Sequence, residues 1–321
     1  MWTALGLFLL VLPLLLVGGL VGYIYYFVRK NLLGQLERAF VEKPLFIIPR
    51  GEPDPRAEEV RFPTADGRHL QGIYFKTEVS PRKGVILFGI EYGSDRWSCR
   101  SYCDPLLAAG YDIFAYEPRN QGKSDAIPGY EPLQWIANYE VEDARAALAY
   151  LKTRPDKDER GVGLFGVSKG ANAGLALAAE DPWVRCVATD GAFGLVSVML
   201  PYMRHWIRIY NKNFLVHGLM PAWFYAHMAR AGVRRVQRAR KVGFFHLEER
   251  MDQVRQPLLM IHGEADSYIK VEMARALFRR AAGPKEFWAV PGAKHNLSIT
   301  VAGPEYARRV VAFFDRHLKR D

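Results

Sequence analysis

Cysteine is scarce in this chain of 321 residues, which has three cysteines and therefore an odd number. So small a set excludes a disulfide framework as the basis of the fold. Cys186 lies in an apolar run and is expected to be a small buried residue. Cys99 and Cys103 are two thiols on one expected helix, whereas a zinc site needs about four ligands. Because a phosphate-binding loop is also missing, we expect neither a metal ion nor a cofactor.

The sequence also lacks internal repeats and low-complexity tracts, and half of its residues are apolar, as in an ordinary globular protein. The formal net charge of +10 comes mostly from scattered residues, with one dense basic cluster: Arg230, Arg234, Arg235, Arg238, Arg240 and Lys241. That cluster is either the solvated face of a helix or a surface that attracts anionic lipid headgroups. No recognition motif accompanies the charge, so nucleic acid is not an expected partner. The sequence does not indicate whether the chain is a monomer or an oligomer.

Charged residues are absent between Trp2 and Val28, a segment rich in Leu, Val and Gly. About 20 such residues span a bilayer, and the basic start and small-residue cleavage site of a signal peptide are missing. Aromatic residues gather at the end of the segment, before Arg29 and Lys30, as at a membrane interface. We therefore expect residues 2–28 to form a single transmembrane helix. The positive charge after it favours a cytoplasmic location for the rest of the chain.

After a linker at 29–57, alternating apolar and helical runs predict an α/β core in two parts, 58–190 and 253–321. Strands are expected at 58–62, 69–76, 84–90, 111–116, 161–166, 184–189, 257–262 and 285–290, and helices at 98–109, 132–153, 169–180, 270–282 and 303–319. Strands this apolar are typical of a parallel sheet buried on both faces. The alternation predicts a doubly wound, mostly parallel sheet of eight strands. Asp66-Gly67 predicts an antiparallel hairpin at its start.

Residues 191–252 lack a strand pattern and are expected to form an inserted helical cap. Aromatic residues are frequent there: Phe193, Tyr202, Trp206, Tyr210, Phe214, Trp223, Phe224 and Tyr225. Most of them are expected to pack the cap onto the core. A few would line an apolar substrate pocket or touch the bilayer.

The pentapeptide Gly166-Val167-Ser168-Lys169-Gly170 lies between an expected strand and an expected helix. This is the setting of a nucleophile elbow, in which a strained turn exposes a serine hydroxyl. Its two outer glycines remove Cβ atoms that would clash with the strand and the helix. The helix N-terminus directs backbone N–H groups toward a developing oxyanion, and Lys169 is expected to supply one of them.

A serine nucleophile needs a base, and the base needs a carboxylate to orient it. His295 follows the last expected strand, and Asp266 follows the strand before it. Glu264 and Asp190 remain alternative acids. Ser168, Asp266 and His295 follow one another in the chain order that this kind of site requires, and all three fall at carboxyl ends of strands, where open sheets build their sites.

Together with GVSKG, the segments FPTADGRHLQGIYF, YDIFAYEPRNQGKSD, IHGEADSYI and VPGAKHN resemble the α/β-hydrolase superfamily. The resemblance covers roughly residues 58–318 and is nearest the serine-aminopeptidase-like and monoglyceride-lipase-like branch. It implies that the two-part core has the α/β-hydrolase fold. It also implies a triad of Ser168, His295 and Asp266, and hydrolysis of an ester, thioester or amide through an acyl-enzyme.

One departure from the family lies at residues 87–95, LFGIEYGSD. The family usually has His-Gly after its third strand, followed by the second oxyanion donor. Ile90 and Glu91 occupy those positions here, which makes Tyr92, or else Glu91, the expected donor beside Lys169. Losing such a donor costs about 3–4 kcal/mol, and a carboxylate there hinders catalysis unless it points away.

Two functions of different classes are compatible with these features. The leading hypothesis is a membrane-anchored serine hydrolase acting on a small-molecule or lipid-like acyl ester. An aminopeptidase is less favoured because the cap is basic. The alternative is a non-catalytic, membrane-tethered binding or scaffold protein of the same fold.

Overall fold

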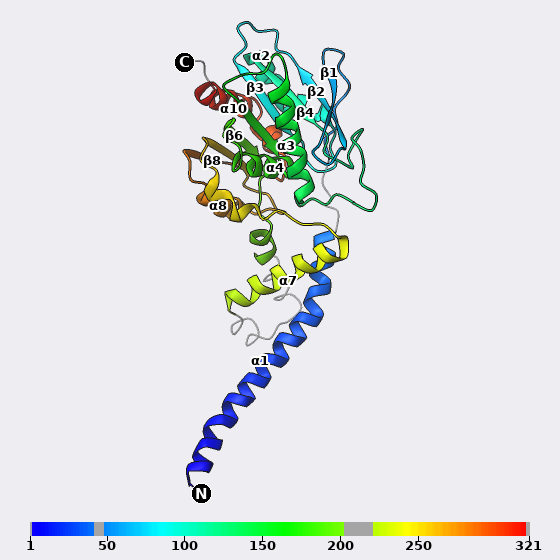
Figure 1. Ribbon diagram of the computed structural model, residues 1–321. Helices are drawn as coiled ribbons and strands as arrows, with labels where there is room; N and C mark the ends of the chain where they lie inside the picture. Colours follow the sequence, from blue (N-terminus) through cyan, green and yellow to red (C-terminus); the bar gives the residue numbers. More distant parts are fainter. Residues whose placement is uncertain (1, 42–47, 202–220, 319–321) are drawn as a thin grey trace. The chain divides into compact units, whose positions relative to one another are not determined.

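The computed structural model describes residues 2–41, 48–201 and 221–318, and the chain forms two compact units (Figure 1). The larger unit comprises Lys43–Met199 and Val242–Asp321, and the smaller comprises Met1–Glu42 and Leu200–Lys241. The larger unit contains the sheet that the sequence predicts.

Eight strands form one sheet in the order β1-β2-β4-β3-β5-β6-β7-β8. The strands are β1 (Glu58–Pro63), β2 (His69–Phe75), β3 (Gly84–Gly89), β4 (Tyr111–Tyr116), β5 (Val162–Val167), β6 (Val184–Asp190), β7 (Leu258–Gly263) and β8 (Lys285–Val290). β2 pairs antiparallel with β1 and with β4, and all other pairs are parallel. The predicted doubly wound, mostly parallel sheet and its opening hairpin are both confirmed.

Helices cover both faces of this sheet. They are α2 (Cys99–Ala109), α3 (Asn138–Thr153), α4 (Lys169–Ala178), α8 (Val271–Arg280), α9 (Ser298–Ala302) and α10 (Pro304–His317), with short 3-10 turns η1 (Arg96–Ser98), η2 (Leu247–Glu249) and η3 (Met251–Gln253). Successive strand residues point to opposite faces, so Leu164 of β5 packs with α3 and α4 while Phe165 packs with α2 and α10. This two-sided burial explains why the strands are almost wholly apolar.

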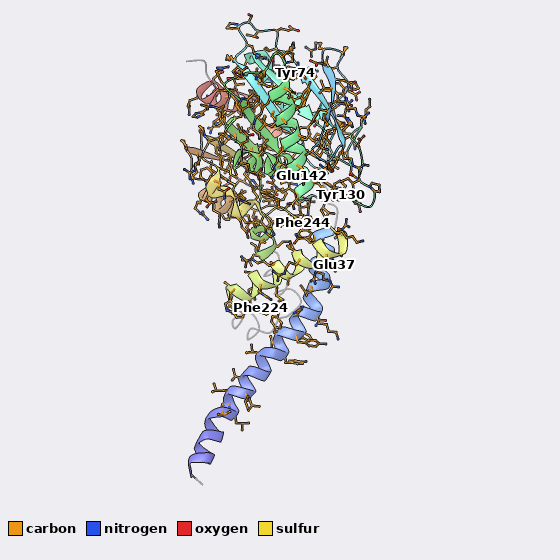
Figure 2. The ribbon with its side chains drawn as sticks, in the orientation of Figure 1. Glu37, Tyr74, Tyr130, Glu142, Phe224 and Phe244 are labelled. Carbon is orange, nitrogen blue, oxygen red and sulfur yellow. The ribbon has the colours of Figure 1, made fainter. Side chains whose placement is uncertain are left out.

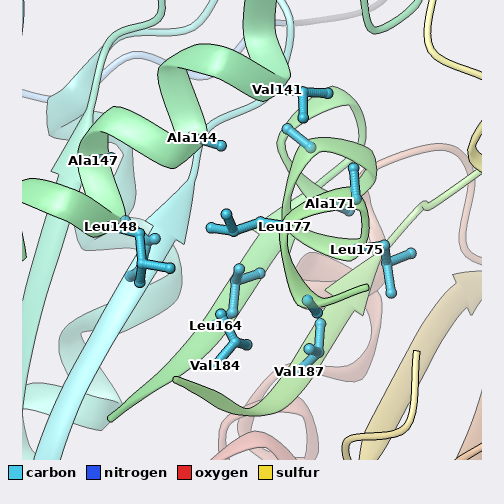
Figure 3. Close-up of a cluster of buried hydrophobic side chains, with 14 of the residues drawn as sticks. Val141, Ala144, Ala147, Leu148, Leu164, Ala171, Leu175, Leu177, Val184 and Val187 are labelled. Atoms are coloured by element: carbon cyan, nitrogen blue, oxygen red, sulfur yellow. The ribbon is translucent and has the colours of Figure 1, made fainter. Parts of the chain in front are cut away.

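The packing beneath α3 and α4 fixes the central strand (Figure 3). Leu148 of α3, Leu177 of α4 and Leu164 of β5 belong to one buried cluster. Each fully buried leucine contributes about 1.5–3 kcal/mol relative to an exposed one. Since β5 lies between β3 and β6 in the sheet, the chain leaves it at Ser168 from a rigid position.

The helix expected at 132–153 begins only at Asn138. Ala137 has extended backbone and forms an isolated antiparallel bridge with Phe244, and the N–H of Phe245 donates to the carbonyl of Ile136 at 3.0 Å. The Glu140 carboxylate then accepts from the N–H of Ala137 at 2.7 Å. The helix starts late because a distant segment pairs with the backbone that precedes it, which local periodicity does not reveal.

The smaller unit contains the helices α1 (Trp2–Val41) and α7 (Ala222–Arg240). Within α1, Val11–Asn31 is long and apolar enough to cross a bilayer. The helix continues past Val28, where the sequence suggests the end of a span, through part of the expected linker. Of the aromatic residues expected in the cap, Tyr202, Trp206, Tyr210 and Phe214 lie outside the described residues. Of the segment 191–252 expected as a cap, residues 200–241 belong to the smaller unit. The rest of that segment, 191–199 and 242–252, belongs to the larger unit.

Candidate functional site

The carboxyl ends of the parallel strands bring the predicted site residues to one edge of the sheet. In register, Gly89 of β3 pairs with Gly166 of β5, and Val167 of β5 pairs with Asp190 of β6. Ser168 follows β5 directly, with φ 51° and ψ −115°. That backbone conformation is strained for a residue with a side chain. It is held by a 2.8 Å hydrogen bond from the N–H of Ser168 to the carbonyl of Asp190.

Glycines make this turn possible through close backbone contact. A Cβ on Gly170 would lie 2.2 Å from the carbonyl oxygen of Gly89, and one on Gly166 would lie 2.7 Å from the backbone of Ala171. Real Cβ atoms do not approach backbone atoms so closely. The first residues of α4 can therefore pack against the ends of β3 and β5 only because these positions are glycine.

Ser168, His295 and Asp266 form a continuous hydrogen-bonded chain. The Ser168 Oγ lies 3.1 Å from His295 Nε2, and His295 Nδ1 lies 2.6 Å from Asp266 Oδ2. The side chains come from three separate loops, after β5, β8 and β7. All three residues are buried. The structure thus brings together the three residues that the sequence singles out, in the order hydroxyl, imidazole, carboxylate.

The Asp266 carboxylate is oriented by its own loop. Its Oδ1 accepts hydrogen bonds from the N–H groups of Tyr268 and Ile269, at 2.8 and 2.9 Å, which leaves Oδ2 directed at His295. His262 braces the same loop, since its Nε2 lies 2.6 Å from the carbonyl oxygen of Ile269. Burial lowers the pKa of His262, which keeps this imidazole neutral beside the carboxylate.

The two alternative acids do not occupy this position. Glu264 is exposed. Asp190 is buried and accepts hydrogen bonds from the hydroxyls of Ser298 and Tyr306, each at 3.0 Å. Burial raises the pKa of Asp190 to about 6. Asp266 is therefore the carboxylate that contacts His295.

Glu91 is turned into the protein interior. Its side chain accepts hydrogen bonds from the Tyr102 hydroxyl at 3.0 Å and from the Asn296 amide nitrogen at 2.6 Å. Burial raises the pKa of Glu91 to about 7, although both hydrogen bonds oppose the shift. Asn296 follows His295 directly and has φ 56°, a left-handed conformation that asparagine tolerates well. Glu91 thus ties the loop after β3 to the loop that carries His295.

Lys169 has a buried side chain, like Glu91. Its Nζ donates to Glu140 Oε1 at 2.7 Å and lies 5.6 Å from the centroid of the Tyr92 ring. The Tyr130 hydroxyl donates to the same carboxylate oxygen at 2.5 Å. Since Lys169 opens α4, its backbone N–H belongs to the group of amides that no carbonyl within the helix can accept. The three residues expected at an oxyanion site, Lys169, Tyr92 and Glu91, therefore lie in adjacent segments.

Sequence reasoning missed three residues that hold this site together: Asn296, Glu140 and Tyr102. The position of Asn296 beside His295 was a usable signal, because asparagine is enriched where φ is positive. Glu140 and Tyr102 carried no such signal. Their roles depend on residues far away in the chain.

The fold is that of an α/β hydrolase, and the comparisons with known proteins agree. The model of the Alpha/beta hydrolase family matches residues 89–312, and the chain belongs to that family. YqkD of Bacillus subtilis is 24% identical over 265 residues, covering 79% of this chain and 78% of its own. The thiohydrolase apmlB of Arthrinium phaeospermum is 31% identical over 136 residues, covering 41% of each chain.

Among solved structures, the esterase Pf2001 of Pyrococcus furiosus superposes with a TM-score of 0.64 at 21% identity. The match covers 87% of this chain and 98% of that one. At this identity the likeness establishes the shared fold.

Proposed function

We propose that this protein is a membrane-anchored serine hydrolase that cleaves acyl esters or thioesters, with Ser168 as nucleophile, His295 as base and Asp266 as the orienting acid. The observation that carries the proposal is the hydrogen-bonded chain from Ser168 Oγ through His295 to Asp266. A strained, buried serine with an imidazole in reach and a carboxylate behind it has little structural use otherwise.

The chemistry is that of acyl transfer through a serine. Ser168 Oγ forms a bond to the acyl carbon while its proton moves to His295 Nε2, and the imidazolium is stabilised by Asp266. The tetrahedral intermediate then collapses, and the alcohol or thiol leaves with that proton. Water adds to the acyl-enzyme with His295 again as base, which releases the acid and restores Ser168.

The oxyanion of that intermediate needs backbone donors. Lys169 N–H supplies one from the start of α4, and Tyr92 N–H supplies the other from the loop after β3. The Glu91 side chain is engaged by Tyr102 and Asn296, so its carboxylate does not occupy the space of the oxyanion. The departure from the usual His-Gly is therefore compatible with catalysis.

The substrate class is an acyl ester or thioester, small or lipid-like. Both an esterase and a thiohydrolase occur among the similar proteins.

Val11–Asn31 supplies the anchor, and exposed Arg29 and Lys30 near its end favour the cytoplasm for the rest of the chain. We also propose that the chain belongs to the serine-aminopeptidase-like and monoglyceride-lipase-like branch of the family, on the motifs of its core. We assign 58–190 and 253–321 to the catalytic core, with 191–252 as the segment inserted in it.

A fluorophosphonate probe tests the proposal, because it reacts only with activated serines. The full chain in detergent should be labelled, and Ser168→Ala and His295→Ala should abolish the labelling. Ser101→Ala, which changes an exposed serine on α2, should leave it intact. Parallel assays with medium-chain oxygen esters and their thioester counterparts then separate the two substrate classes. A folded wild-type chain that resists the probe would replace this proposal with the binding or scaffold function.

A further inference from the structure

α7 carries a strongly basic face. Arg230, Arg234, Arg235 and Arg238 are exposed, and their spacing places them on one side of the helix; we call these four residues the arginine face. The opposite side of α7 is buried and apolar: Phe224, Tyr225, Met228, Ala229, Gly232, Val233 and Val236. The helix is therefore amphipathic, with guanidinium groups rather than mixed charges on its outer side.

α7 runs alongside the second half of α1 in the smaller unit. The rings of Tyr25 and Phe224 lie 5.9 Å apart, and the Tyr25 hydroxyl lies 3.2 Å from His227 Nε2. Further along both helices, Arg235 Nε donates to Glu37 Oε2 at 2.9 Å. Figure 2 labels Phe224 and Glu37, which mark the two ends of this contact. Phe224 and His227, at the start of α7, are level with Tyr25, and Arg235 is level with Glu37.

This alignment sets the depth of α7 relative to a bilayer. Tyr25 lies within the apolar segment Val11–Asn31, near its end. Glu37 is six residues beyond Asn31, or about 9 Å along a helix. The headgroup layer on each side of a bilayer is about 5–8 Å thick. The helix α7 therefore begins level with the last turns of the apolar segment, and its arginines lie between that level and the outer edge of the headgroup layer.

Exposed aromatic residues agree with this depth. Trp223 is 67% exposed at the start of α7, and Tyr26 and Phe27 of α1 are 60% and 51% exposed. Large aromatic side chains are unfavourable in water and concentrate at membrane interfaces. The smaller unit thus presents exposed apolar rings at the level where α7 begins, and the arginine face follows further along that helix.

We propose that α7 passes through the membrane interface beside α1 and that its arginine face binds anionic lipid headgroups. The inference rests on the proposed membrane anchoring by α1. Planar guanidinium groups suit phosphate because they donate two parallel hydrogen bonds to it, and each basic residue near an anionic surface adds to the attraction. Arg235 is engaged by Glu37, so Arg230, Arg234 and Arg238 carry most of the binding.

Energy transfer to labelled lipids tests this surface in the full chain. Ala239 is exposed, whereas Cys99, Cys103 and Cys186 are buried, so Ala239→Cys accepts a fluorescent donor selectively. The labelled protein is reconstituted into phosphatidylcholine vesicles with about one fifth phosphatidylglycerol. A trace of acceptor is carried on either lipid. Transfer to the anionic lipid should exceed transfer to the neutral one by about twofold or more.

The preference should vanish in Arg230→Gln/Arg234→Gln/Arg238→Gln and in 1 M salt, where the Debye length is about 3 Å. The matched control Arg185→Gln/Arg279→Gln/Arg280→Gln removes the same charge from exposed sites of the larger unit and should keep the preference. Equal transfer in the wild type, loss in the control, or displacement of the lipid by added single-stranded RNA would each overturn the proposal. Carbonate extraction distinguishes a failure of the proposed membrane anchor from a failure of the proposed role of α7. Protein released by carbonate refutes the anchor itself, whereas retained protein without lipid preference refutes only the role of α7.

Discussion

Asn296 donates a hydrogen bond of 2.6 Å from its side-chain amide to the carboxylate of Glu91, and so joins the loop after β3 to the loop of His295. The two residues are 205 positions apart in the chain. Both are buried, and the Oδ1 atom of Asn296 has no hydrogen-bond partner. A Cβ on Gly191 would lie 2.9 Å from that oxygen, so glycine at 191 leaves the amide its space. Glu91 therefore acts as a clamp on the loop that presents the imidazole.

The Glu91 clamp predicts different outcomes for two substitutions. Glu91→Gln should preserve it, because rotation of the Asn296 amide presents the unpartnered Oδ1 to the new NH₂ group while Tyr102 still donates to the remaining oxygen. Glu91→Ala leaves Tyr102 and Asn296 without partners and should cost about 2–4 kcal/mol. Urea unfolding in detergent measures the loss, and fluorophosphonate labelling should slow only in the alanine variant. Equal behaviour of the two variants would refute the clamp.

Stability should also depend on pH through Glu91. Burial raises its pKa from 4.5 to about 7, so the native state binds the proton more tightly than the unfolded chain does. The resulting stabilisation is complete below pH 4.5 and is lost as the pH rises through about 7. Glu91→Gln has no proton to lose. Between pH 4.5 and about 7, the free energy of unfolding of Glu91→Gln minus that of the wild type should therefore rise, by up to about 3 kcal/mol. A difference that does not change with pH would show that the raised pKa of Glu91 does not contribute to stability.

Much of the larger unit could be predicted because its signals are local. The apolar run of β5, the glycines on either side of Ser168 and the helix after it specify the elbow within one short segment. His295 and Asp266 could be assigned because each follows a recognisable strand. The orientation of Glu91 could not be predicted, because it depends on hydrogen bonds from Tyr102 and Asn296. The residues next to Glu91 in the sequence do not indicate either contact.

The late start of α3 has the same cause. The periodicity of residues 132–153 suits a helix throughout, but pairing of Ala137 with Phe244 holds the first residues extended. The buried pair of Lys169 and Glu140 was hidden for a related reason. A lysine after a nucleophilic serine suggests a solvated side chain, and only the packing of α3 against α4 places a carboxylate beside it.

The close approach of α4 to β3 predicts that Gly170→Ala disables the site. Its Cβ would meet the carbonyl oxygens of Gly89 and Ile90 at 2.2 and 2.5 Å, so the backbone must shift at both proposed oxyanion donors. Overpacking of this kind costs about 1–3 kcal/mol, and we expect labelling of Ser168 to fall more than tenfold. Gly67→Ala is the control, because its φ is +78° but no atom lies within 4 Å. That variant should lose about 1 kcal/mol and label normally; a normal labelling rate in Gly170→Ala would refute the argument.

Lys169 and Glu140 form an ion pair in which both side chains are buried. Removing one of them leaves the charge of the other buried and uncompensated. Lys169→Met should destabilise the protein by about 3–5 kcal/mol. Glu140→Gln in the same chain should recover most of the loss, since the amide can still accept from Ala137. Lys152→Met is the matched control, because Lys152 and Asp181 form a partly exposed pair worth about 0–1 kcal/mol. Urea unfolding of the four proteins decides the matter, and similar losses for both lysine variants would show that burial adds nothing to the pair.

Asp266→Asn should abolish activity while leaving the fold intact. The amide oxygen can keep the hydrogen bonds from Tyr268 and Ile269, which turns the NH₂ group toward His295 Nδ1. The imidazole must then carry its proton on Nε2, facing Ser168, and cannot accept the serine proton. A tautomer fixed in this way lowers kcat by about 10⁴ in a triad of this type.

Two neighbouring carboxylates serve as controls for this effect. Glu264→Gln changes an exposed side chain and should leave turnover of an ester substrate unchanged. Asp190→Asn keeps an acceptor for Ser298 or Tyr306 and should slow turnover by well under tenfold. Initial rates with one ester, measured for the three variants at matched folded fraction, rank the acids directly. If turnover by Asp190→Asn fell as far as turnover by Asp266→Asn, Asp266 would not be the only orienting acid and this assignment would be wrong.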